Sequence, residues 1–249
     1  MYFIWSFVYL PFSIQAFIQQ GLSSTVITLL WKGNDFALWY LWGTVVATLF
    51  VVMLYRLFRG NCTKVMVVSL ILFLIGLLSS TWNPLISKCF PVLANVLQEV
   101  EVMVGCRSGL LYGTVYVSLG LLISQNNMLS KKASLIGFFI SMLFLVMESI
   151  IFVLFFRTEK TVLWLSVIPA TWFLVSFLLR LEIDVPMKLC KMLRSMSTVM
   201  YLSQYLFIIT WSNFLSGFQL FVTTTVSAII FSVALMMLSK RLPILKCLY

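Results

Sequence analysis

The sequence has 249 residues, of which 62% are hydrophobic and 10% are charged, and its mean hydropathy is +1.08. Soluble domains contain about 45–50% apolar and about 25% charged residues, so this composition excludes a soluble globular fold. The net charge of +10 is typical of a membrane protein with Lys and Arg in its cytoplasmic loops, which we favour over nucleic-acid binding. Histidine is absent, so the commonest metal ligand and general base is missing.

The apolar residues form continuous runs rather than alternating patterns, which indicates helices. Helices also satisfy their own backbone hydrogen bonds in lipid, and each span needs about 20 apolar residues. We therefore predict an all-α polytopic transmembrane helical bundle that forms a single membrane domain over residues 1–249. The sequence predicts about eight spans, at residues 1–17, 36–57, 65–82, 108–124, 133–156, 161–180, 197–213 and 218–238.

The segment between the third and fourth predicted spans, residues 83–106, is less apolar. It contains two prolines and the carboxylates Glu99 and Glu101. We expect it to be a loop with a short interfacial or re-entrant helix, with the two glutamates on a solvated face.

The distribution of Lys and Arg predicts the orientation of the spans. Twelve of the 17 basic residues lie on the side that holds residues 58–64, and five lie on the other side. Because cytoplasmic loops carry the excess of Lys and Arg, we expect both termini in the cytoplasm. The first span begins at Met1 with no Lys or Arg before it, so we expect that something upstream is missing.

The five cysteines show no C-x-x-C motif and no spacing typical of a metal site, so no metal is expected. Cys89 and Cys106 both fall on the predicted outer side. They form a disulfide only if their Cα atoms lie within about 4.4–6.8 Å.

Four stretches of sequence, taken together, resemble one family. They are FIWSFVYLPFSI (3–14), NDFALWYLWG (34–43), CRSGLLYGTVYVSLGLLIS (106–124) and STVMYLSQYLF (197–207). In this order and spacing they resemble the acyltransferase-3 family of integral membrane O-acyltransferases, and also the membrane domain of membrane-bound serine racemases. The resemblance implies ten spans with both termini cytoplasmic. This chain resembles the last eight, so the first two would precede Met1.

The resemblance implies transfer of an acyl group, commonly acetyl, from a coenzyme A thioester to a hydroxyl of envelope carbohydrate or a related molecule. Acyl-CoA would then be a co-substrate rather than a bound cofactor, and the location would be the bacterial inner membrane. The family's catalytic histidine lies in the part that is absent here. The family often has histidine where this chain has Ala37 and Gln204, whereas the arginine of its Arg-x-Gly pattern is kept as Arg107. We therefore expect a truncated or inactive member, or one that works with a separate chain supplying the missing helices.

Glu148 lies inside the apolar run SMLFLVMESIIFVLFF, residues 141–156. A charge near the bilayer centre costs at least about 2.5–3.5 kcal/mol, so such residues usually face a bundle interior or a wet cavity. Three roles are open. The carboxylate could pair with Arg107 or another inward-facing group, line an acceptor pocket, or sit protonated with little function.

Five further residues are candidates for substrate binding. Arg107 is either an interfacial anchor or a cation directed at a carbonyl, phosphate or carboxylate. Trp39 and Tyr40 either stack on a sugar or belong to an interfacial aromatic belt. Tyr201 and Gln204 come from the late motif, and glutamine cannot act as a base at pH 7.

A function of another class is also open. A buried glutamate and an arginine suit a non-enzymatic membrane component of polysaccharide export or polymerisation. A purely structural membrane subunit is a third possibility, and it would tolerate neutral substitution of both residues.

Overall fold

The computed structural model describes residues 4–9, 11, 39–105, 108–125, 129–156, 163–182 and 184–242, and all regular structure in them is helical. The chain divides into two compact units, which are described separately below. One is Tyr40–Glu182, and the other combines residues up to Trp39 with those from Ile183 onward.

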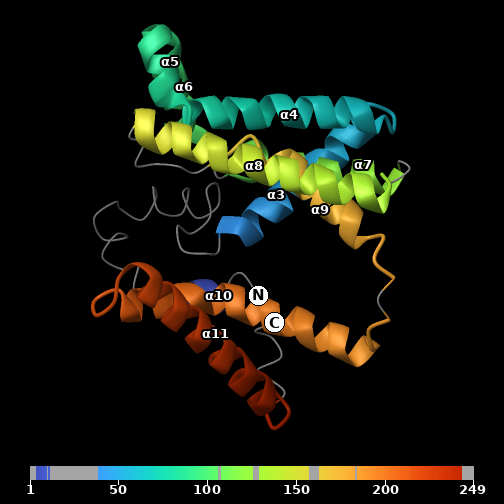
Figure 1. Ribbon diagram of the computed structural model, residues 1–249, viewed down its shortest axis with the longest axis vertical. Coiled ribbons are helices and arrows are strands. Elements are labelled where there is room, and N and C mark those ends of the chain that lie inside the picture. The colour runs from blue at the N-terminus through green and yellow to red at the C-terminus, as the bar shows by residue number, and fades with distance from the viewer. Residues whose placement is uncertain are drawn as a thin grey trace. The chain divides into compact units, whose positions relative to one another are not determined.

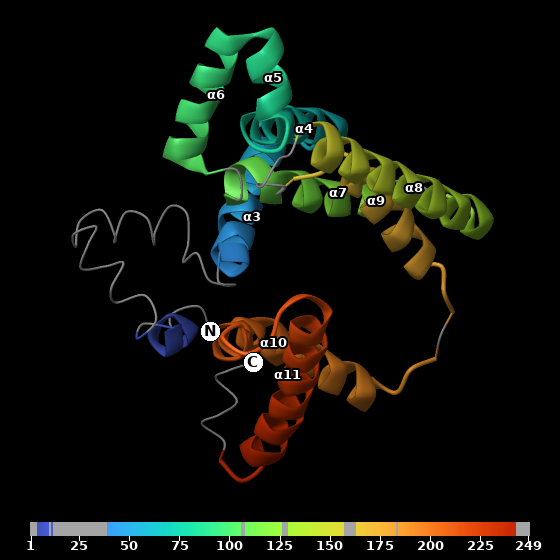
Figure 2. The same ribbon diagram turned by 60° about the vertical axis from the view of Figure 1, so that its left-hand side comes forward.

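The Tyr40–Glu182 unit is a helical bundle. The long axes of α4, α7 and α8 run in similar directions, α3 crosses them, and α5 and α6 form a hairpin beyond the end of α4 (Figures 1 and 2). Its helices are α3 (Trp39–Leu57), α4 (Cys62–Ser79), α5 (Asn83–Cys89), α6 (Pro91–Val104), the π-helix η1 (Gly109–Gly113), α7 (Thr114–Gln125), α8 (Lys131–Phe156) and α9 (Val167–Leu178).

Four described helices are long and apolar enough to cross a membrane: α3, α4, α8 and α11 (Gly217–Ser239). The count is five if α6 and η1–α7, which are bent by 107°, form one broken span. The predicted span 161–180 contains α9, whose 12 residues reach only about 18 Å. Most of the predicted span 1–17 lies outside the described residues. The all-helical class and the membrane spans are confirmed, but the number eight is not.

The segment between α4 and η1 contains more regular structure than we expected. Instead of a loop with one short helix it holds two helices, and Pro84 and Pro91 lie in their first turns. Proline is tolerated there because those N–H groups have no partner within the helix. Glu99 and Glu101 therefore lie on α6 rather than in a loop, and Glu99 is exposed.

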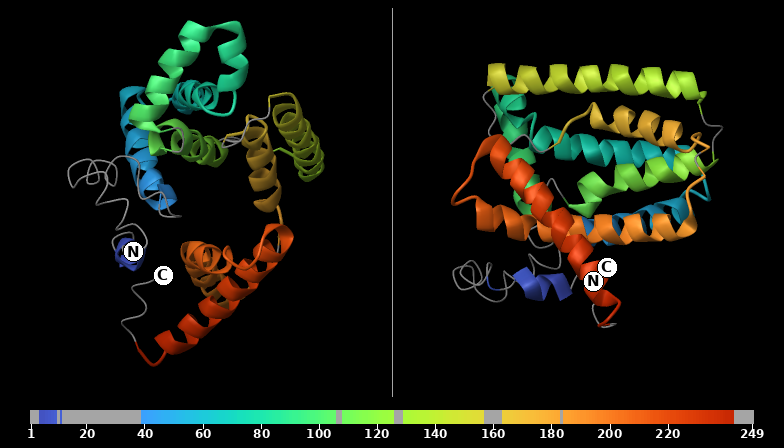
Figure 3. Two further views of the ribbon diagram at one scale, coloured as in Figure 1. Left: turned by 90° about the vertical axis from the view of Figure 1, so that its left-hand side faces the viewer. Right: turned by 60° about the horizontal axis from the view of Figure 1, so that its bottom comes forward.

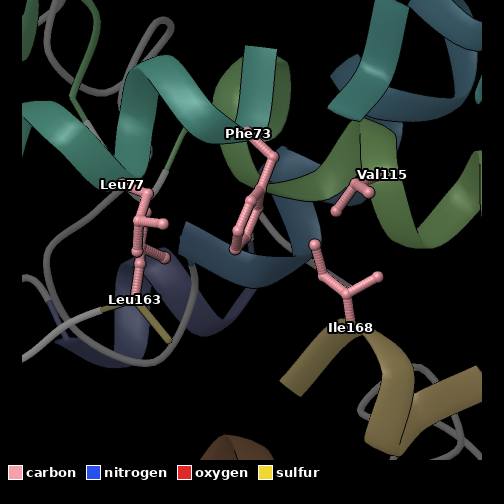
Figure 4. Close-up of a cluster of buried hydrophobic side chains, with 5 residues drawn as sticks. All are labelled: Phe73, Leu77, Val115, Leu163 and Ile168. Carbon is pink, nitrogen blue, oxygen red and sulfur yellow. The ribbon is translucent and has the colours of Figure 1, made fainter. Parts of the chain in front are cut away.

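The core of this unit joins α4, α7 and the start of α9. Its buried side chains come together from segments far apart in the sequence: Phe73, Leu77, Val115, Leu163 and Ile168 (Figure 4). Near this core, the buried hydroxyls of Ser69 on α4 and Ser118 on α7 lie 2.7 Å apart and share a hydrogen bond. Lipid tails are as apolar as leucine, so close packing and such interhelical hydrogen bonds hold membrane helices together.

The backbones of α3 and η1 make unusually close contact. A Cβ atom built on Gly109 would lie 2.2 Å from the carbonyl oxygen of Gly43, and one built on Gly113 would lie 2.8 Å from the Cβ of Ala47. The pairs Gly43/Ala47 and Gly109/Gly113 each follow the small-xxx-small spacing that lets membrane helices approach closely.

The second unit contains α10 (Met187–Trp211), α11 and a helical segment at residues 4–9. Figure 3 shows α10 and α11 packed obliquely after a short connection. The indole of Trp211 donates to the hydroxyl of Ser227 at 3.3 Å. The hydroxyl of buried Tyr9 donates to the carbonyl of Leu202, so the early segment is tied to α10.

We predict that Gly109→Ala destabilises the protein strongly, by about 3 kcal/mol or more, because the added methyl group meets a backbone atom that cannot move aside. Gly120→Ala is the matched control on α7, since its Cβ would have nothing within 4 Å. The measurement is unfolding by denaturing detergent, followed by circular dichroism. Equal stability of the two variants would show that the close contact is not needed.

Candidate functional site

The carboxylate of Glu148 accepts four hydrogen bonds. Oε1 accepts from the indole Nε1 of Trp82 at 3.3 Å and from the backbone N–H of Leu165 at 3.0 Å. Oε2 accepts from the backbone N–H of Ser166 at 3.0 Å and from its hydroxyl at 2.6 Å. The four donors come from the turn after α4 and from the segment that leads into α9.

These bonds tie α8 to the turn that enters α9. Leu165 and Ser166 lie just before the first residue of α9, and Ser166, at its N-cap, makes no capping bond with its own side chain. The N–H groups of Val167 and Ile168 bond to the carbonyls of Trp164 and Leu165. The carboxylate on α8 therefore satisfies the two N–H groups that precede the helix, and a negative group is also favoured near the positive end of the helix dipole.

Aromatic side chains pack around the carboxylate. The ring of Trp82 stacks on Phe152 with centroids 5.6 Å apart, and Phe152 meets Trp164 edge-on at 6.3 Å. Beside them, the buried hydroxyl of Thr81 accepts from the N–H of Leu163 at 2.9 Å. We name this group of residues the Glu148 junction: Thr81, Trp82, Glu148, Phe152 and Leu163–Ser166.

This geometry bears on the three roles open for Glu148. An ionised carboxylate offers about four acceptor positions, and the chain's own donors occupy four of them. The side chain therefore binds the protein itself, as structural glue between α8, α9 and the α4–α5 turn. Arg107, one of the partners considered for it, lies outside the described residues.

The α3–η1 contact brings together two of the motif stretches singled out in the sequence. Gly43 closes the stretch 34–43, and Gly109 is the glycine of the Arg-x-Gly pattern in the stretch 106–124. Ser108 is the N-cap of the π-helix, and its hydroxyl accepts from the N–H of Leu111 at 3.3 Å. π-helices are rare and frequently mark functional sites. We name Gly43, Ala47, Gly109 and Gly113 the α3–η1 joint.

Trp39 and Tyr40 form the first two residues of α3, one helical turn before Gly43. The side chain of Tyr40 is 51% exposed. Cys89 is an exposed free thiol at the end of α5, and Cys106 lies outside the described residues.

The late motif lies on α10 in the other unit. Leu202 and Ser203 are fully buried, whereas Tyr201 and Gln204 are partly exposed. The rings of Tyr9 and Tyr205 meet edge-on at 6.2 Å, so the stretches 3–14 and 197–207 also come together. Each unit thus contains one pair of motif stretches in contact.

Sequence reasoning missed the residues that carry these contacts. It singled out Arg107 but not the adjacent glycine pattern, although Gly-x-x-x-Gly in an apolar run is a known signal for close helix packing. It also named Glu148 without its partners Trp82 and Ser166. No local pattern connects α8 with the turn after α4, because the two are 66 residues apart in the sequence.

The helices and the polar junction within them define an α-helical membrane protein. Comparison with known families goes further: an acyltransferase-domain model, that of the acyltransferase-3 family, matches residues 1–241. The chain belongs to this family, which indicates membrane acyltransferase activity. No curated protein and no solved structure matches it.

We predict that Glu148→Gln lowers stability by about 2–3 kcal/mol. An amide offers one acceptor atom instead of two, so two of the four donors lose their partner in this partly buried site. Hydrogen exchange measures the loss of protection at the Leu165 and Ser166 amides. Unfolding by denaturing detergent measures the change in the stability of the whole protein. Met147→Leu is the control, because Met147 is the exposed neighbour on the same helix. Unchanged exchange at both amides in Glu148→Gln would contradict the role of Glu148 as their acceptor.

Proposed function

We propose that this protein is a membrane O-acyltransferase-like protein that moves an acyl group, acetyl by resemblance, from coenzyme A to a hydroxyl of envelope carbohydrate. The family match over residues 1–241 carries the proposal. The α3–η1 joint supports it, since the joint unites two of the stretches on which the resemblance depends. The proposed location is the bacterial inner membrane with both termini in the cytoplasm.

The reaction sets a clear chemical requirement. The acceptor hydroxyl oxygen attacks the thioester carbonyl, the C–S bond breaks, and the sulfur leaves as the thiol of coenzyme A. The proton of the hydroxyl passes to a base, which contributes about 10²–10⁴-fold to the rate. A donor or cation near the carbonyl oxygen stabilises the negative charge that develops there.

The described residues suit the binding roles better than the role of the base. Glu148 is occupied by four donors, and the sequence has no histidine. We therefore propose that the base comes from outside these 249 residues, on helices that complete the bundle. The 249 residues alone would then be inactive.

We assign the binding roles by position in the motifs. Trp39 and Tyr40 at the start of α3 would stack on the acceptor sugar. Arg107, two residues before Gly109 in the sequence, would hold the carbonyl or a substrate anion. Tyr201 and Gln204 would hydrogen-bond to acceptor hydroxyls.

Transfer of radiolabel from acetyl-CoA to carbohydrate in membranes tests this proposal. We expect no label with this chain alone, and label when it is co-expressed with a segment that carries the family's first two helices and their histidine. In that pair, Arg107→Ala should reduce transfer by about 10²-fold or more, as does loss of a group that stabilises the developing charge. Arg157→Ala is the control, an arginine outside the motifs.

Two results would overturn the proposal. Label from this chain alone would show that its own residues supply the base. Absence of label with the partner segment, together with no binding of coenzyme A in equilibrium dialysis, would exclude acyl transfer. Transport of labelled saccharide without any thioester would then favour a component of polysaccharide export.

A further inference from the structure

One end of the Tyr40–Glu182 unit collects the ends of five helices. The thiol of Cys62, the first residue of α4, donates to the Oε1 of Gln125 at the end of α7 at 2.8 Å. The Nε2 of Gln125 donates to the hydroxyl of Tyr55 on the last turns of α3 at 3.4 Å. At the start of α8, the amine of Lys131 lies 6.0 Å from the ring centroid of Phe177 near the end of α9. These contacts place the α3–α4 turn and the α7 terminus together, and the start of α8 beside the end of α9.

This end is strongly basic. We name its six exposed basic residues the basic rim: Arg56, Arg59, Lys64, Lys131, Lys132 and Arg180. Among the described residues of this end, Glu182 is the one acid. The α5–α6 hairpin at the opposite end of α4 carries Lys88 with Glu99 and Glu101, so the charge is concentrated at one end.

Helix stability does not explain all of these positions. Lys131 and Lys132 lie in the first turn of α8, which contains no acidic residue. A helix dipole favours anions there, so two cations gain nothing from the helix itself. The excess of Lys and Arg in cytoplasmic loops accounts for cations on this side, and a negative group from outside the protein would stabilise these two.

The surface next to the rim is apolar. Leu57 on α3, Ile136 on α8 and Leu179 after α9 are 68%, 60% and 56% exposed. Each lies within five residues of a rim residue in the sequence. Basic groups above exposed apolar helix faces are complementary to a molecule with a negative head and long hydrocarbon chains.

We propose that the basic rim binds anionic phospholipids of the adjacent leaflet, with the phosphate head groups on its Lys and Arg side chains and the acyl chains along α3, α8 and α9. Basic residues next to membrane helices attract anionic lipids with about 1 kcal/mol each. The site is independent of acyl transfer and would persist in a chain that has no activity.

Native mass spectrometry of the full chain in detergent tests the proposal, with equal amounts of phosphatidylglycerol and phosphatidylcholine that carry the same acyl chains. We expect retained phosphatidylglycerol to exceed phosphatidylcholine, and the preference to fall as ionic strength rises. In the triple variant K131Q/K132Q/R180Q, affinity for phosphatidylglycerol should fall about fivefold for each charge removed. Phosphatidylcholine retention should not change.

Two variants serve as controls. Lys88→Gln removes a lysine from the opposite end of the unit and should leave the preference intact. The triple variant K131R/K132R/R180K keeps all three charges and should also retain it. Helical circular dichroism and gel filtration show whether each variant is folded. If K131Q/K132Q/R180Q does not fold, two other measurements test the proposal. They are the salt dependence of lipid retention by the unmodified chain and the lipid retention of K131R/K132R/R180K.

Equal retention of the two lipids by the unmodified chain would overturn the proposal. An equal loss in Lys88→Gln would also overturn it, because the effect would then not belong to the rim. A third result would identify a soluble-anion site instead. Coenzyme A or inorganic phosphate would displace phosphatidylglycerol, and the protein would retain the two lipids equally.

Discussion

In a bilayer, backbone N–H groups at a helix end have no water to bind, so each needs an acceptor from the protein. The turn that enters α9 meets this constraint with a carboxylate from another helix. Glu148 accepts the N–H groups of Leu165 and Ser166 and thereby fixes the entry into α9. The 12-residue helix α9 packs closely along α8, and the bonds of Glu148 add a polar link between the two helices.

The Glu148 junction also shows how a glutamate is accommodated in an apolar helix. Burying its charge raises the free energy, and this cost falls when its oxygens accept from donors that also need a partner. The ring of Trp82 stacks on Phe152. Its indole N–H is one of the four donors, so Trp82 both packs on α8 and binds the carboxylate.

The α3–η1 joint achieves precision by another route. There, the absence of side chains lets two backbones touch, and the π-helix η1 begins at the glycine of the Arg-x-Gly pattern. If Arg107 and the aromatic residues at the start of α3 bind substrate, this joint is what holds their chain segments in place. The Glu148 junction would then be a support for the bundle rather than part of the chemistry.

The sequence by itself determined the helical class, the membrane environment, the family and the importance of a lone glutamate in α8. Continuous apolar runs and the order of four motifs are local signals, so they can be recognised in the sequence without a structure. The tertiary structure decided the partners: Glu148 with Trp82 and Ser166, Gly43 with Gly109, Tyr9 with Leu202. Among the described residues it contains four or five helices of suitable length and composition, so the eight predicted spans are not confirmed. Such contacts join residues from 17 to 193 positions apart, and no local pattern encodes which distant backbone group a side chain will meet.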